Sequence, residues 1–236
     1  MLTATLIAIS FSIGFFIESI IGFGGGLIAY SFLGFFIDFK MMILAGLYIG
    51  TLSSAYIIST DYKSFDKKTF KSAILLSLVG TIIGVIFFTK FSSAILTKLF
   101  AFLLIILSIK ILFFDKYIFP KFFKQKLILL GGISQGAFGV GGPFWVSALQ
   151  KDFQNKSNLR TTMAAFFFGF NIIRFIELYF ENQLDLEFFL DISWTILPVL
   201  IAIKLGHKVH VRINENYFKK GIAIITFLAA IKFIVM

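Results

Sequence analysis

Two glycine-rich segments, each set inside strongly apolar sequence, constrain the fold of this chain more than any other feature. The first is Gly22-Phe23-Gly24-Gly25-Gly26, and the second is Gly139-Val140-Gly141-Gly142-Pro143. An offset of 117 positions superposes the first segment on the second, with glycine on glycine at three places. Corresponding interruptions of apolar sequence in the two halves of a chain are typical of a duplicated membrane protein whose working site lies where helices break.

The composition also indicates a membrane protein. Of the 236 residues, 58% are hydrophobic and only 14% are charged, and the mean hydropathy is +0.95. A soluble domain of this length needs more charge to cover its core. The formal net charge of +10 comes mostly from loops between apolar runs, so we expect the lipid bilayer and no nucleic acid as a partner. Cysteine is absent, which excludes disulfides and thiolate chemistry.

The lengths of the apolar runs separate spanning helices from half-helices. A helix needs about 20 residues to cross a hydrocarbon core about 30 Å thick. The run 27–37 has only eleven residues, so we expect half a helix there. Pro198 predicts a kink in one longer run. The runs expected to span are 41–60, 72–89, 94–114, 161–180, 188–206 and 221–236, the last beginning about a turn earlier.

The basic loops set the expected topology. Fifteen of the 22 Lys and Arg residues lie in the loops 61–71, 115–126, 151–160 and 207–220. Because such loops face the cytoplasm, residues 127–150 must leave that side and return to it. About 24 residues are too few for two spans, which predicts a re-entrant hairpin with Gly139–Pro143 at its tip. Residues 3–37 are then the matching hairpin, although 3–21 is also long enough to span fully.

The predicted fold class is an all-α polytopic membrane protein with two inverted repeats, each a broken or re-entrant hairpin plus three transmembrane helices. The repeats are residues 1–117 and 118–236, which together form one transmembrane domain. No basic region and no cleavage site precede Glu18, so we expect a retained segment of a multi-pass protein of the inner membrane. The pattern is compatible with a homo-oligomer.

The two glycine segments are the predicted substrate-binding backbone. Glycine permits sharp turns and brings N–H groups to the surface, and the half-helix that follows each segment has partial positive charge at its N-terminus. Two such ends near the midplane of the membrane would hold a small anion. The alternative is close helix packing, for which glycine is common in membranes. The presence of two aligned clusters favours the functional break.

A carboxylate adds a further candidate. Glu18 lies one turn before the first glycine segment and aligns with Gln135. An acidic side chain inside an apolar segment is costly and is a functional candidate by default. It is a candidate for proton coupling. The alternatives are that it caps local backbone or pairs with a lysine.

Other polar side chains interrupt the apolar helices of both halves. Arg174 and Glu177 are three residues apart on a helix, which suits a mutual ion pair. Alternatively, Arg174 lines the anion path, with Asn171 one turn earlier. Ser53 and Ser54 lie in the corresponding region of the first half. They either contact the ligand or hydrogen-bond to their own helix.

Catalytic machinery is not apparent in the sequence. There is no Ser/His/Asp arrangement, no P-loop and no dinucleotide fingerprint. His207 and His210 do not make a metal site by themselves, because no carboxylate or cysteine lies nearby to complete it. We therefore expect no enzyme, no metal and no cofactor.

Four motifs resemble those of a known family of permeases. Residues 18–28 read Glu-Ser-Ile-Ile-Gly-Phe-Gly-Gly-Gly-Leu-Ile, and residues 132–143 read Gly-Ile-Ser-Gln-Gly-Ala-Phe-Gly-Val-Gly-Gly-Pro. The segments 158–162 (Asn-Leu-Arg-Thr-Thr) and 171–174 (Asn-Ile-Ile-Arg) extend the likeness to nearly the whole chain. The chain resembles the sulfite exporter TauE/SafE family of bacterial and archaeal permeases. The resemblance implies transport of small anions such as sulfite, thiosulfate or organosulfonates.

The predicted function is transport of a small anion by alternating access, with proton coupling through Glu18. One alternative is a channel-like anion pore, in which the same hairpins form a filter. Another is a non-catalytic membrane subunit of a larger complex.

Overall fold

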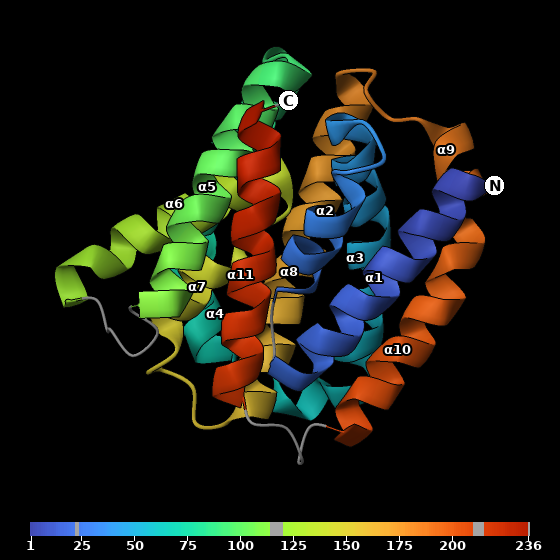
Figure 1. The fold of residues 1–236 in the computed structure, drawn as a ribbon. Helices are drawn as coiled ribbons and strands as arrows, with labels where there is room; N and C mark the ends of the chain where they lie inside the picture. The colour runs from blue at the N-terminus through green and yellow to red at the C-terminus, as the bar shows by residue number, and fades with distance from the viewer. Residues whose placement is uncertain (22–23, 114–119, 210–214, 236) are drawn as a thin grey trace. The chain divides into compact units, whose positions relative to one another are not determined.

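The computed structural model describes residues 1–21, 24–113, 120–209 and 215–235, and within these residues it is helical and contains no strand (Figure 1). Gly22, Phe23 and His210 lie outside the described residues. Three short 3-10 turns, η1 (Tyr62–Ser64), η2 (Lys121–Phe123) and η3 (Ser193–Thr195), join some of the helices. The helices are α1 (Leu2–Ile21), α2 (Gly25–Leu33), α3 (Phe39–Asp61), α4 (Lys67–Lys90), α5 (Ser93–Phe113), α6 (Lys124–Phe138), α7 (Gly142–Leu149), α8 (Lys156–Phe180), α9 (Leu186–Asp191), α10 (Ile196–Val209) and α11 (Glu215–Val235).

The helix lengths agree with most of the predicted spans. Among the described helices, α1, α3, α4, α5 and α8 are long and apolar enough to cross a membrane. The half-helix expected over 27–37 is α2, which has nine residues. The helix α11 begins before residue 221, as predicted. The apolar part of α1 has 19 residues, so by length and composition this arm is able to span fully.

The predicted kink at Pro198 is wrong in its position. The chain breaks earlier, where η3 separates α9 from α10, and Pro198 is the third residue of α10. Proline lacks a backbone N–H, but the first turn of a helix leaves its N–H groups without intrahelical acceptors. Pro198 is therefore tolerated at the beginning of α10 and does not bend an existing helix.

The helices gather into two compact units, and each unit takes elements from both halves of the sequence. The first unit contains α1, α2, α5, α10 and α11, with α3 up to Ala45. The second contains α3 from Gly46, together with α4, α6, α7 and α8. The compact units therefore do not coincide with the proposed repeats 1–117 and 118–236.

Aromatic rings form the centre of the first unit. Phe100 on α5 lies 6.0 Å from the Tyr30 ring of α2, 5.5 Å from the Phe39 ring of α3 and 5.8 Å from the Phe233 ring of α11, centroid to centroid. All four side chains are buried. Edge-to-face contacts of this kind add to the stabilisation that apolar burial supplies, so one phenylalanine links three other helices.

Glycines bring α4 and α6 together in the second unit. A Cβ at Gly80 would lie 2.9 Å from the backbone nitrogen of Ile133, and one at Gly84 would lie 2.7 Å from that of Ala137. Gly132 and Gly136 on α6 meet α4 in the same way. Close backbone approach through small residues is the usual means of packing helices in a membrane. This packing fixes the position of α6 against α4. It thereby also fixes the position of the second glycine segment, which follows directly after α6.

Candidate functional site

The first glycine segment joins two antiparallel helices, α1 and α2, within the first unit. Glu18 of α1 contacts Gly25 at the start of α2, and further from the break the Phe11 ring of α1 packs 5.9 Å from the Tyr30 ring of α2. Gly24 has φ 94°, in the left-handed region that favours glycine. The backbone N–H of Gly25 donates a hydrogen bond to Glu18 Oε2 at 2.6 Å. The carboxylate therefore occupies the positive end of α2.

The second glycine segment joins α6 and α7 in the same manner within the second unit. Gly139 has φ 72° and ends α6, where its N–H and that of Val140 donate to the carbonyls of Gln135 and Ser134. The bond from Gly139 to Gln135 is the 5→1 bond of the αL motif, which satisfies a carbonyl at a helix end. Pro143 lies in the first turn of α7, where its missing N–H costs nothing. The helix breaks predicted at both glycine segments are confirmed.

Corresponding side chains support the start of each half-helix. Gln135 is the counterpart of Glu18, and its Oε1 accepts the backbone N–H of Gly141 at 2.9 Å. The first half-helix is thus capped by a carboxylate and the second by a neutral amide. One alternative for Glu18 was that it caps local backbone, and the structure contains such a contact, the hydrogen bond from the Gly25 N–H. This difference makes the two hairpins electrostatically unlike.

Gly14 and Gly131 let each half-helix lie close to its partner. They are also 117 positions apart in the sequence. A Cβ on Gly14 would collide with the Gly25 carbonyl, and one on Gly141 would lie 2.6 Å from the Gly131 carbonyl. The packing role considered for the glycines is therefore real at Gly25 and Gly141. It accompanies the break and does not replace it.

A buried polar network adjoins the second hairpin. Arg174 on α8 is 1% exposed, and its Nε donates to the carbonyl of Gly136 at 3.0 Å. Its Nη1 lies 3.5 Å from Oδ1 of Asn171, which also accepts Gln135 Nε2 at 2.9 Å. Through Gln135 the network reaches the N–H of Gly141. A cationic side chain is thus connected by three hydrogen bonds to the beginning of α7.

Gly50 of α3 leaves open space beside the amide of Asn171. A Cβ at Gly50 would lie 3.5 Å from Asn171 Nδ2, and no other heavy atom counted around it lies within 4 Å. Ser53 and Ser54 follow one helical turn later on α3, so they lie on the same face as Gly50. Both serines are buried, and Ser53 Oγ has no hydrogen-bond partner among the described residues.

The structure brings together most of the predicted site residues of the second unit. Asn171 and Arg174 lie at the second hairpin, which contains Gly139, Val140, Gly141, Gly142 and Pro143. Glu18, Gly24, Gly25 and Gly26 belong to the hairpin of the first unit. Gln135, Gly50 and the Gly136 carbonyl were not expected at the site. The alignment of Gln135 with Glu18 was the signal that identified the first of these, whereas the other two depend on packing.

Glu177 lies one turn beyond Arg174 on α8, where an ion pair between the two was considered. Glu177 is half-buried, and its Oε2 has no hydrogen-bond partner among the described residues. The hydrogen bonds of Arg174 described above go to two uncharged groups on α6 and α8. The Nε of Arg174 is therefore held by the backbone of the hairpin arm.

Two features of the second unit suit an anion, which are the beginning of α7 and the buried Arg174. The N–H of Gly142 contacts no acceptor within the described residues, and Pro143 has no N–H to offer. Helix N-termini attract anions because their amides and dipoles point outward. Buried arginine in a membrane helix faces the protein interior or a wet cavity and marks ion and substrate pathways. No group of three His, Cys, Asp or Glu side chains in the described chain is arranged to hold a metal.

Comparison with known proteins assigns this chain to a protein family. A search of curated proteins returned no match, and neither did a search of solved structures. The profile of the family described as Sulfite exporter TauE/SafE matches residues 6–233, which is nearly the whole chain. The described helices supply the long apolar segments that a permease requires. The chain therefore belongs to the sulfite exporter TauE/SafE family and is a multi-pass membrane transporter, not an enzyme.

Proposed function

We propose that this permease carries a small sulfur-containing anion, such as sulfite, thiosulfate or an organosulfonate, across the inner membrane. The observation that carries this proposal is the buried Arg174, which donates to the Gly136 carbonyl of α6 and is linked through Asn171 and Gln135 to the N–H of Gly141. A cation at this depth, tied to the hairpin backbone, offsets part of the cost of removing an anion from water. The description of the family, Sulfite exporter TauE/SafE, supports the choice of a sulfur-containing anion.

The substrate contacts that we propose lie on both sides of the second glycine segment. Arg174 contributes charge, and the amide groups of Asn171 and Gly142 donate hydrogen bonds. Ser53 and Ser54 extend the polar surface from α3. Val140 and Pro143 shape the turn, and the hairpin at Gly24, Gly25 and Gly26, with Gly22 and Phe23, serves the transport path of the first unit.

Glu18 is the proposed proton-coupling group. Its carboxylate holds the N–H of Gly25, the position that an anion would otherwise occupy at the start of α2. Protonation would weaken this contact, because a neutral acid accepts a hydrogen bond less strongly than a carboxylate does. Release of α2 would then accompany the alternating-access motion, in which one inverted repeat rocks against the other.

The first test is a thermal-shift screen of the purified protein with sulfite, thiosulfate, sulfate, taurine, sulfoacetate, acetate and phosphate. A ligand that binds only the folded state raises the melting temperature by mass action. We expect a shift with at least one sulfur anion, and saturable uptake of that anion in vesicles that contain the purified chain alone. Saturation separates a carrier from a pore, and activity of the chain alone excludes a mere subunit.

Arg174→Lys keeps the charge but loses the planar fork of donors. We expect it to weaken anion binding at least tenfold. Arg160→Lys is the matched control, because Arg160 pairs with Asp61 at 3.2 Å and takes no part in the network. If Arg174→Lys binds every anion as the wild type does, the proposed site is wrong.

A further inference from the structure

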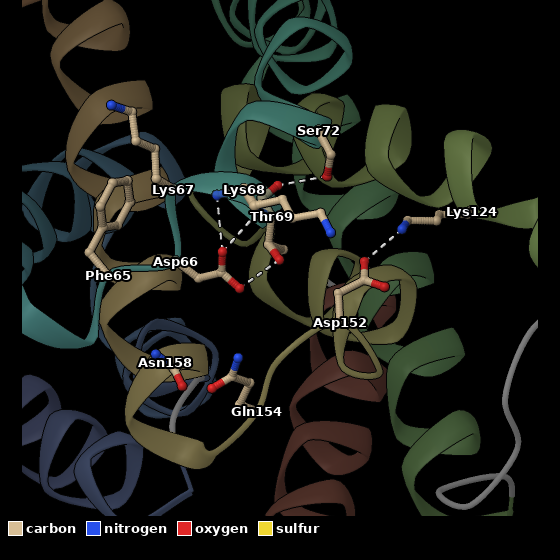
Figure 2. Close-up of a pocket in the computed structure, with 10 residues that line it drawn as sticks. All are labelled: Phe65, Asp66, Lys67, Lys68, Thr69, Ser72, Lys124, Asp152, Gln154 and Asn158. Carbon is tan, nitrogen blue, oxygen red and sulfur yellow. Dashed lines mark hydrogen bonds and ion pairs between the residues drawn. The ribbon is translucent and has the colours of Figure 1, made fainter.

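A second polar site lies in the unit that contains α4, α6 and α8, and it shares no residue with the buried network. It is a hollow of about 600 Å³, which Figure 2 shows. Three of the basic loops, 61–71, 115–126 and 151–160, contribute to its wall. The lining residues are Phe65, Asp66, Lys67, Lys68, Thr69, Ser72, Lys124, Asp152, Gln154 and Asn158.

Both acidic side chains of this hollow are already engaged by the protein. Asp66 Oδ1 accepts the backbone N–H groups of Lys68 at 3.0 Å and Thr69 at 3.1 Å, and Oδ2 accepts the Thr69 hydroxyl at 2.9 Å. Asp66 thereby caps the start of α4. Asp152 accepts the ammonium group of Lys124 at 2.6 Å. Because both carboxylates already have these partners, we do not expect either of them to be the main ligand of a cation in the hollow.

The remaining charge in the hollow is positive. Lining it are three lysines and two aspartates. Figure 2 shows the Lys68 side chain extending toward the Lys124–Asp152 pair, whereas Lys67 points away from it. The Asp66 cap takes its hydrogen bond from the backbone N–H of Lys68 and not from its ammonium group, which acts on Asp66 through its charge. Gln154 adds an exposed side-chain amide at the edge.

We propose that this hollow binds a phosphate ester, which is either the headgroup of an anionic phospholipid or a soluble phosphate of similar size. Its volume lies within the range of small-molecule sites, about 300–1,000 Å³, and a lone oxyanion would leave most of it empty. Lysine ammonium groups bind phosphate as point charges. Basic segments beside membrane helices attract anionic lipids on the cytoplasmic side, the side to which the loop charges assign this hollow.

The test uses the full-length protein in an uncharged detergent, followed by its melting temperature. The probes are dioctanoyl phosphatidylglycerol, dioctanoyl phosphatidylcholine and glycerol 3-phosphate. A rise with phosphatidylglycerol alone identifies a lipid headgroup, and a rise with glycerol 3-phosphate identifies a soluble ester; both support the site. Equal shifts with the two lipids, or no shift with either anionic probe, overturn it.

Lys68→Gln locates the binding. One basic residue near an anionic headgroup contributes about 1 kcal/mol, so we expect about fivefold weaker binding of the active probe. The backbone of residue 68 still donates to Asp66, so the unliganded melting temperature should not change. Lys98→Gln, an exposed lysine of α5 outside the hollow, should bind like the wild type. Wild-type affinity in Lys68→Gln would overturn the proposal, and binding of the transported anion reports separately on the proposed function.

Discussion

Gly50→Ala tests the proposed anion site without disturbing the fold. A Cβ at this position would lie 3.5 Å from Asn171 Nδ2, which is ordinary van der Waals contact. An oxygen of a bound anion needs to approach that nitrogen to about 2.7–3.2 Å. The added methyl group therefore occupies space that the bound anion needs. It does not collide with atoms of the protein.

The magnitude follows from the lost hydrogen bond. A hydrogen bond to a charged group contributes about 1.5–3 kcal/mol, so Gly50→Ala should raise the dissociation constant about tenfold to a hundredfold. Stability should move the other way, because alanine is favoured over glycine inside a helix by about 1 kcal/mol. Weaker binding by a protein that is at least as stable distinguishes a site residue from a structural one.

The control is Gly169→Ala. Gly169 also lies inside a helix of the second unit, α8, and a Cβ there would meet nothing within 4 Å. Titration calorimetry with the active anion and melting curves of the three proteins complete the assay. If Gly50→Ala binds as tightly as Gly169→Ala, the amide of Asn171 does not contact the substrate. If Gly50→Ala melts at a lower temperature than the wild type, the conclusion that a methyl group fits at position 50 without a collision is wrong.

Three further predictions concern other parts of the chain. Glu18→Gln should keep the N–H acceptor for Gly25 and the melting temperature, yet flatten the pH dependence of transport in vesicles; an unchanged pH profile would remove Glu18 from proton coupling. Gly84→Ala should destabilise the protein by about 1–3 kcal/mol because its Cβ would meet the α6 backbone, whereas Gly221→Ala, whose Cβ meets nothing within 4 Å inside α11, should melt no lower than the wild type. Hydrogen bonds, first from the Thr69 backbone N–H, hold the pKa of Asp66 below its usual range. The lowered pKa stabilises the fold above the ordinary aspartate pKa, and this contribution is lost as the pH falls through the folded-state pKa. Asp66→Asn should therefore reduce the fall in melting temperature on acidification, and an identical acid profile would contradict this.

Much of the helix pattern was predictable because it depends on local properties. The number of consecutive apolar residues determines whether a segment forms a spanning helix or a half-helix, and α2 and α3 agree with that expectation. The breaks at Gly24 and Gly139 also follow locally, since positive φ is strained for other residues. Pro198 shows the limit of such reasoning, because its effect depends on whether a helix has already begun before it.

The candidate site was predictable only in part. Arg174 and Asn171 are conspicuous as polar residues in an apolar segment, and the glycine segments are conspicuous as repeats. Their hydrogen bonds to Gly136 and Gln135 depend on how α8 lies against α6, which no local pattern specifies.

The sequence by itself determined the helical class, the half-helices and the two glycine breaks, because hydrophobic length and backbone freedom are properties of short segments. Only the tertiary structure decided which helices share a compact unit. It places α4 with α6 and α1 with α10, across the boundary between the two halves. Gly84 and Gly136 give α4 and α6 surfaces without side chains, so their backbones meet closely. That long-range fit positions the second hairpin beside Arg174.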